Sequence, residues 1–335
     1  MAAVYNPTSL SDLIVPEIFA PYFQVRTSEK SAVLSSGIAE SSPQLAAYAT
    51  GAGQTFHLPF FQDLGGVDNV IQEGTNIDVE NITAEQEVAV VLNRAKAWGA
   101  SYLSRVTTGE DIMNRIGNLV GDWWARRHQA VLLSVLNAMF RYDAAGNTSP
   151  QWGKIRTSHL LDKSTDPFEA THIIEAMGKL GDASGQLSAM VMHSAIYHSL
   201  SKNDLIDYER DSTAGTQFPT YLGKKIIVDD ACTSEQTNVF RTYLFNNGAI
   251  QYGQGSVPPR DAVETDRNTL GSEDILITRQ RMIFHPRGFR WKGGINPDND
   301  TSLTSTTSLI NPDNWVKVIE DKQVGMVAIE SLAAI

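Results

Sequence analysis

The sequence is poor in cysteine, in long apolar runs and in secretion signals. Its 335 residues contain a single cysteine, Cys232, which excludes an intrachain disulfide and a metal cluster built from cysteines. No run approaches the ~20 apolar residues that cross a bilayer, and the N-terminal segment lacks the basic region and apolar core of a secretory signal. We therefore expect a soluble protein without a membrane partner.

Motifs that mark enzymes are also missing. The chain has no G-x-S-x-G nucleophile elbow, no phosphate-binding P-loop and no strand-linked G-x-G-x-x-G. His193 and His198 are five residues apart, whereas histidines that share a metal on a helix are three or four apart. The turn NPDND at 296–300 lacks the central glycine and distal glutamate of a calcium loop. We expect no catalytic residue, no cofactor and no metal; a hydrolase using His193 and His198 stays a distant alternative.

Lysine and arginine are absent from one long segment, which runs from Gly51 to Asn93. The chain as a whole has 27 basic and 38 acidic residues, a formal net charge of −11, which disfavours extensive binding to nucleic-acid backbones. The acids of the segment are Asp63, Asp68, Glu73, Asp78, Glu80, Glu85 and Glu87.

The residues that are present indicate an α+β fold. The composition, 42% hydrophobic and 19% charged, is typical of a folded protein with a sizeable core. Residues 151–165 are expected to form a loop, and Ser194 to cap the helix that follows it. Because the strands come in batches, without alternating βαβ units, the class is α+β. Expected strands are 54–61, 87–98, 187–193, 223–231, 239–253, 273–285 and 324–330; expected helices are 110–140, 166–180 and 194–203, with short pieces in 1–50.

The first two strands flank an excursion of about 25 residues, far longer than an ordinary connection. Pro59 confines the strand at 54–61 to a sheet edge, because proline cannot donate a ladder hydrogen bond. The apolar residues of the excursion cannot be buried on its own hairpin. We therefore expect another chain to bury these apolar residues and to supply basic partners for the acids.

The longest periodic pattern predicts a helix from Glu110 to Phe140, about 46 Å long. Thr107 and Glu110 have the spacing of a capping box at its start. Its middle reads GDWWARRHQAVL, in which Trp123 and Arg127 are four residues apart, as are Trp124 and His128. We interpret this stretch as a packed seam with Trp123 and Trp124 in the core, because the helix presents no partner for a catalytic histidine.

Six features in order give the chain a resemblance to a known family. They are the short-helix arm, the acidic excursion, the long helix with WW-A-RR-H-Q, MVMHSAIYHSL, the pair GKKIIVDD and TYLFNNGAI, and the late HPRGFRW. Together they resemble a tailed-bacteriophage major capsid protein with the Hong Kong 97-type fold. The implied parts are an N-terminal arm (1–53), an extended E-loop (54–104), a peripheral domain (105–182) with its spine helix (108–141), an axial domain (183–265), and peripheral strands with a C-terminal return strand (266–335).

The resemblance implies a coat subunit that assembles as pentamers and hexamers into an icosahedral shell around double-stranded DNA. It also implies scaffolding, portal and cement proteins as partners, non-specific contact with packaged DNA, assembly in the host cytoplasm and a place in the virion. An encapsulin-like nanocompartment shell is the alternative. Because the excursion between the first two expected strands has no lysine, the lysine–asparagine cross-links of some family members cannot start there. The candidate contacts between subunits are the acids Asp63, Asp68, Glu73, Asp78 and Glu80 with the basic residues Arg94, Lys96, Arg126 and Arg127.

Overall fold

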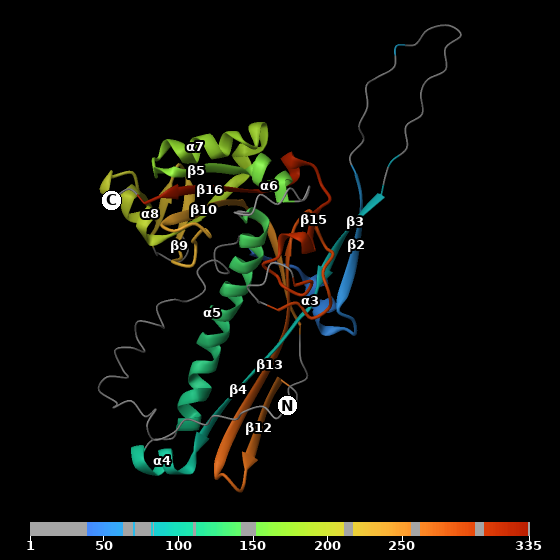
Figure 1. Cartoon of the computed structure of the whole chain (residues 1–335), viewed down its shortest axis with the longest axis vertical. Helices are drawn as coiled ribbons and strands as arrows, with labels where there is room; N and C mark the ends of the chain where they lie inside the picture. Colours follow the sequence, from blue (N-terminus) through green and yellow to red (C-terminus); the bar gives the residue numbers. More distant parts are fainter. Residues whose placement is uncertain are drawn as a thin grey trace.

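The computed structural model describes residues 39–62, 70, 82, 84–109, 112–141, 152–210, 217–255, 262–298 and 305–333. The helices expected before residue 39 and the acids Asp63, Asp68, Glu73, Asp78 and Glu80 lie outside these residues. The described residues form three β-sheets, and one long helix runs past all of them (Figure 1).

The largest sheet has seven strands in the order β5-β16-β10-β6-β9-β8-β7. Helices α7 (Thr171–Gly178) and α8 (Ser194–Lys202) cover one face, where Ile173 and Ile196 pack on a cluster that contains Leu244. Side chains alternate along a strand, so neighbouring Tyr243 and Phe245 point to the other face and the second core. The strand bounds are β5 Leu160–Pro167, β6 Leu187–Met192, β7 Asp207–Arg210, β8 Gln217–Tyr221, β9 Lys224–Val228, β10 Val239–Asn246 and β16 Met326–Leu332.

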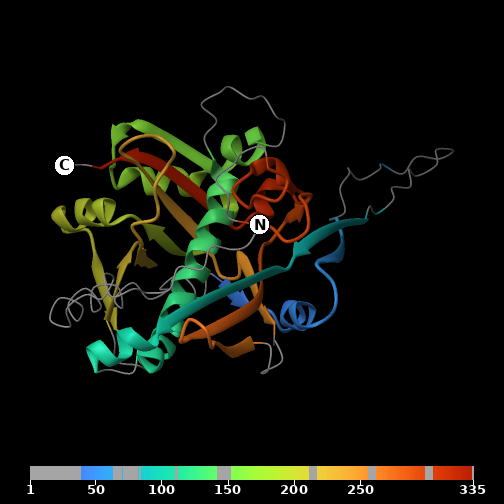
Figure 2. The same cartoon turned by 60° about the horizontal axis from the view of Figure 1, so that its bottom comes forward.

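The second sheet is built around β13 (Glu273–Pro286), which has partners on both edges. Strand β4 (Leu92–Ser101) pairs with it antiparallel from Glu273↔Ser101 to Met282↔Leu92. Strands β12 (Val263–Asn268) and β11 (Ile250–Gly255) share the other edge, and β1 (Ala39–Ser41) adds to β11 in parallel. The result is a long ribbon that runs beside the helix (Figure 2).

The third sheet has the order β15-β14-β3-β2 and carries the base of the acidic excursion. Its strands are β15 Trp315–Lys317, β14 Phe289–Trp291, β3 Ala84–Val90 and β2 Thr55–Phe61. The pairing of β2 with β3 runs from Thr55↔Val90 to Phe61↔Ala84, so two strands do flank the excursion. The single strand expected at 87–98 is wrong, because β3 ends at Val90 and the chain continues from Leu92 as β4 of the second sheet. Strand β2 is the edge strand that Pro59 predicts.

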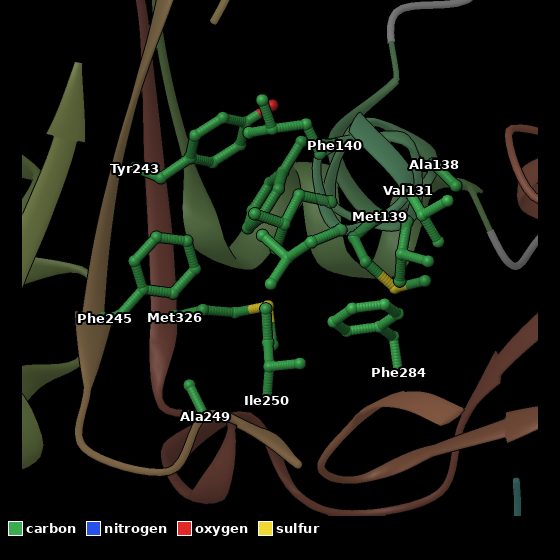
Figure 3. Packing of buried hydrophobic residues seen from close by; sticks show 14 of the residues in the cluster. Val131, Ala138, Met139, Phe140, Tyr243, Phe245, Ala249, Ile250, Phe284 and Met326 are labelled. Carbon is green, nitrogen blue, oxygen red and sulfur yellow. The ribbon is translucent and has the colours of Figure 1, made fainter. Parts of the chain in front are cut away.

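Helix α5 (Ile112–Phe140) confirms the long helix, and its 29 residues give a length of about 44 Å. Its second half is buried between two sheets, where Val131, Met139 and Phe140 point into a shared core (Figure 3). The seven-stranded sheet contributes Tyr243, Phe245 and Met326 to this core, and the second sheet contributes Ile250 and Phe284. One core therefore joins the helix to both sheets. No helix in the described residues is long and apolar enough to cross a membrane.

Helix α3 (Pro43–Thr50) lies directly on β11 because two glycines leave room for it. A Cβ atom at Gly253 would lie 2.5 Å from the carbonyl carbon of Leu45, and one at Gly255 would lie 2.5 Å from the carbonyl oxygen of Ala49. Only glycine allows this approach. Four one-turn or two-turn helices complete the described chain: α4 Tyr102–Thr108, η2 Gly181–Gln186, η3 Pro312–Asn314 and η4 Asp321–Gln323.

Several expected boundaries are wrong, each for a local reason. Thr107 does not cap the long helix: it belongs to α4, its hydroxyl donates to the carbonyl of Leu103, and Gly109 ends that helix with a left-handed φ of 68°. Glu110 lies outside the described residues. The expected strand at 239–253 is two strands, because Gly248 turns the chain with φ of 73° between β10 and β11.

Residues 151–165 are not a loop. They form α6 (Trp152–His159) and most of β5 (Leu160–Pro167), so α7 begins at Thr171 and not at residue 166. The polar sequence of β5 has little strand propensity of its own, and its strand is held by parallel pairing with β16. Ser194 is the first residue of α8, and the cap is His193, whose Nδ1 accepts a hydrogen bond from the Ala195 amide at 3.0 Å.

Candidate assembly site along the long helix

The middle of α5 is fastened to the long ribbon by aromatic side chains. Trp124 is 4% exposed, and its Nε1 donates to Thr278 Oγ1 at 3.1 Å. Trp123 is half-buried and meets Trp98 of β4 edge-on, with ring centroids 5.3 Å apart. Both indoles therefore hold the helix to strands of its own chain.

His128 extends this seam and has no catalytic environment. Its Nε2 lies 2.7 Å from the Gln280 amide oxygen, and its ring lies beside those of Trp124 and Phe284. Burial lowers the pKa of His128, although the hydrogen bond that its Nε2 donates to the Gln280 amide oxygen opposes the shift. The imidazole is thus neutral at pH 7 and serves as a packed hydrogen-bonding group.

Basic residues line the same side of the ribbon as the helix. Arg94, Lys96 and Trp98 follow one another at every second position of β4, so their side chains lie on one face of the strand, and Trp98 contacts α5 on that face. Burial lowers the pKa of Arg94, and the nearby charge of Arg127 lowers it further, against the opposing charge of Asp298. The structure therefore brings Arg94 and Arg127 together. Lys96 is exposed, and Arg126 and Arg127 are half-buried.

Two acids at the base of the excursion have partners within the chain. Glu87 Oε2 lies 2.8 Å from His285 Nε2, and its Oε1 accepts the Gly288 amide at 2.9 Å. Glu85 lies 4.0 Å from Arg290. The expectation that all seven acids of the segment need partners on another chain is therefore wrong for these two.

A buried ion cluster at the C-terminal end of α5 was not foreseen. Arg241 of β10 and Glu330 of β16 are both 0% exposed, and Arg241 donates to Glu330 Oε1 from Nε at 3.0 Å and from Nη2 at 2.5 Å. Arg156 of α6 donates to Glu330 Oε2 at 2.6 Å and to the Phe140 carbonyl at 3.1 Å. The sequence contains a signal, since each of Arg241 and Glu330 is the one charged residue of a mostly apolar strand, and such charges are buried only when paired.

The electrostatics of this cluster keep its charges in place. Burial by itself lowers the pKa of Arg241, but Tyr243, Glu235 and Glu330 outweigh it, so the pKa of this guanidinium lies above its ordinary value. Burial raises the pKa of the Tyr243 hydroxyl, which donates to Asn137 Oδ1 at 2.6 Å. Arg241 therefore stays charged and the Tyr243 hydroxyl stays neutral at pH 7.

The residues of the alternative hydrolase are not assembled into a metal site. His193 caps α8, and His198 lies against the Tyr197 ring. Within the described ranges, no group of three His, Cys, Asp or Glu side chains could hold a metal ion. Burial and the charge of Asp229 raise the pKa of the Cys232 thiol, so it is no nucleophile at neutral pH.

Comparison with known proteins identifies the family to which this architecture belongs. A model of the Gp13-like family, described as major capsid protein 13-like, matches residues 53–326. The major capsid protein of Bacillus phage SPP1 is 37% identical over 328 residues, which cover 96% of this chain and 97% of that protein.

Solved structures share the fold at low sequence identity. The cyanophage Pam1 capsid asymmetric unit matches with a TM-score of 0.55 and 11% identity over 88% of each chain. A structure from Microbacterium phage Oxtober96 matches with a TM-score of 0.54 and 12% identity, over 98% of this chain and 96% of that one. The expectation of a Hong Kong 97-type capsid fold is confirmed, and the family is one of structural proteins and not of enzymes. The chain belongs to the Gp13-like family of major capsid proteins, the subunits that form the capsid shell of a tailed phage.

Proposed function

We propose that the subunit assembles as pentamers and hexamers into an icosahedral shell around double-stranded DNA, with the excursion between β2 and β3 reaching over an adjacent subunit. One observation carries this proposal. The β2–β3 hairpin leads away from the body of the molecule (Figure 1), and the described apolar residues along it, Phe61, Val70 and Ile82, are 69%, 78% and 52% exposed. An apolar arm of this kind is stabilised by burial against another chain.

The excursion between β2 and β3 is acidic, whereas the face formed by α5 and β4 is basic, so the two have opposite charge. The acids Asp63, Asp68, Glu73, Asp78 and Glu80 would contact Arg94, Lys96, Arg126 and Arg127 of a neighbouring subunit. Complementary charge at such a contact favours the correct partner and its register. Because the excursion has no lysine, no covalent cross-link between subunits would begin there, and this shell would be held by non-covalent contacts in that region.

The remaining segments take the roles of the family's parts in this proposal. Residues 1–53 form the N-terminal arm and residues 54–104 the E-loop. The spine helix and the long ribbon form the peripheral domain, and the seven-stranded sheet with α7 and α8 forms the axial domain. This division moves β5 and β16 from the peripheral segments expected from the sequence (105–182 and 266–335) to the axial domain, because both strands pair within its sheet. Strand β11 belongs to the ribbon and therefore to the peripheral domain. Scaffolding, portal and cement proteins, loosely held DNA and assembly in the host cytoplasm complete the proposal.

Charge reversal tests the contact between subunits. Lys96→Glu should reduce the yield of closed shells while the subunit keeps its thermal stability, because Lys96 is exposed. Adding Asp78→Lys should restore shells, and Lys179→Glu, at an exposed position on the opposite side of the seven-stranded sheet from α5, is the control. Electron microscopy counts the shells. A wild-type yield of shells from Lys96→Glu would contradict the charged contact between subunits. Closed shells from a variant that lacks residues 65–82 would contradict the proposal that the excursion reaches over an adjacent subunit.

A further inference from the structure

The buried ion cluster at the end of α5 touches every element that meets there. Arg241 Nη1 donates to Asn137 Oδ1 of α5 at 3.1 Å, and its Nη2 donates to Glu235 at 2.8 Å. Arg156 of α6 contacts the last carbonyl of α5 and the carboxylate of Glu330. Ser234 adds a third donor to Glu330 at 3.1 Å. The cluster therefore joins the helix, α6 and two central strands of the seven-stranded sheet.

Stability alone does not account for these charges. A buried ion pair gains little over well-packed apolar side chains of similar size, because both charges lose their hydration. Two residues whose polar atoms join the cluster, Phe140 through its carbonyl and Tyr243 through its hydroxyl, also belong to the large apolar core. Apolar residues at 241 and 330 would fill this core, so the charges are retained for what only directional bonds provide.

Directional bonds fix an angle. Apolar side chains pack acceptably at several helix orientations, whereas a guanidinium that donates to Asn137, Glu235 and Glu330 at once does so at one orientation only. The cluster lies at the C-terminal end of α5, against the seven-stranded sheet. The other end of the helix lies beside the ribbon (Figure 1). A small change of angle here displaces the far end of a helix about 44 Å long by several ångströms.

We infer that the Arg241–Glu330 cluster sets the angle between the long helix and the seven-stranded sheet, and through it the curvature and uniform size of the shell. The inference rests on the proposed assembly into pentamers and hexamers. In a closed shell every subunit repeats this angle, so a subunit with a less defined angle closes into shells of more than one diameter.

Replacing the pair by apolar residues separates angle from stability. The double variant Arg241→Met with Glu330→Leu leaves no unpaired charge, because Arg156 keeps Asp162 at 3.0 Å and Glu235 keeps Arg141 at 3.9 Å. We expect the subunit to fold with a Tm within about 5 °C of the wild type. We expect its shells, sized by electron microscopy, to lose their single diameter.

A control and a second variant complete the experiment. Removing the half-buried pair Arg279–Glu264 of the ribbon by the same substitutions, Arg279→Met with Glu264→Leu, should leave the diameter unchanged. Arg156→Met keeps Arg241 and Glu330 paired but cuts the link to the last turn of α5, and should broaden the diameters by itself.

The possible results distinguish this inference from the proposed function. Uniform wild-type shells with equally uniform shells of both variants would overturn the inference and leave the proposed function standing. Loss of folding in the double variant would also overturn it, since the cluster would then be needed for stability. Failure of the wild-type protein to form closed shells would instead contradict the proposed function.

Discussion

The middle and the C-terminal end of the long helix are held by different kinds of contact, aromatic in the middle and ionic at the end. Its middle is fastened by Trp123, Trp124 and His128, which contribute large contact areas and single hydrogen bonds. Its C-terminal end is fastened by Arg241, Glu330 and Arg156, whose bonds are short, charged and buried. Aromatic contacts tolerate small displacements, whereas buried charges do not, because losing one bond leaves a charge without compensation. The helix is thus anchored rigidly at one end and packed more tolerantly along its middle.

The sharpest way to break this comparison is to remove one charge and keep the other. Glu330→Ala leaves Arg241 buried with its main partner gone, which should lower the free energy of unfolding by about 3–5 kcal/mol. Urea denaturation of the isolated subunit measures the change. A loss below 1 kcal/mol, by the ordinary standard of exposed pairs, would show that water reaches Arg241 and that the end is not rigidly anchored.

A somewhat smaller loss is expected from the aromatic middle. Trp124→Ala removes a buried indole and its hydrogen bond to Thr278, which should cost about 3 kcal/mol, the lower part of the usual range. The reason for the lower value is that Trp124 lines an open groove with Val263 and Gln280, so water can fill the space. Trp123→Ala, at a half-buried position, is the matched comparison and should cost less. Equal losses from the two substitutions would contradict the packing described for the seam.

The smallest effect concerns pH and, in the aromatic middle of the helix, comes from His128. Burial lowers the pKa of His128 in the folded state, so the unfolded chain binds more protons as the pH falls below about 6.5. Its stabilising contribution is present above that pH and is lost as the pH falls toward the folded-state pKa, by at most about 1.4 kcal/mol per pH unit.

His128→Gln should flatten the pH dependence of stability between pH 7 and 5. His159 is shifted in the same direction by burial and remains as a residual slope in the variant. Thermal unfolding at several pH values measures both slopes. An unchanged slope in the variant would assign the acid sensitivity to other groups.

Some of this architecture is readable from sequence because it is local. The period of α5 predicts its length, and Pro59 predicts that β2 is an edge. By contrast, α6 and β5 are invisible locally, since the polar strand LLDKSTDP exists through its pairing with β16, far along the chain. The prediction that Thr107 caps the long helix is wrong for a related reason. Ser101 caps the separate helix α4 by accepting a hydrogen bond from the Ser104 amide at 3.2 Å, and Thr107 lies within that helix.

The candidate site divides in the same way. Trp124 lies in the core at the centre of an apolar helical stripe, which a periodic pattern can indicate. Arg241 and Glu330 are recognisable one at a time as charges in apolar strands, but their pairing depends on the order of strands β10 and β16 in the sheet. No local pattern carries that order. The contacts expected of the five acids of the arm depend on a second subunit and stay predictions.

The place of β16 in the sheet governs when the subunit can fold. This strand follows every other strand of the described chain, yet it lies between β5 and β10 and pairs with both. Until residues 326–332 are synthesised, β5 and β10 lack the strand that pairs with both, so the seven-stranded sheet cannot be completed. A truncated chain lacks an inner strand, not an outer one, and also the Glu330 that neutralises Arg241. We therefore expect a chain that ends before β16 to leave β5 and β10 without the strand that they share.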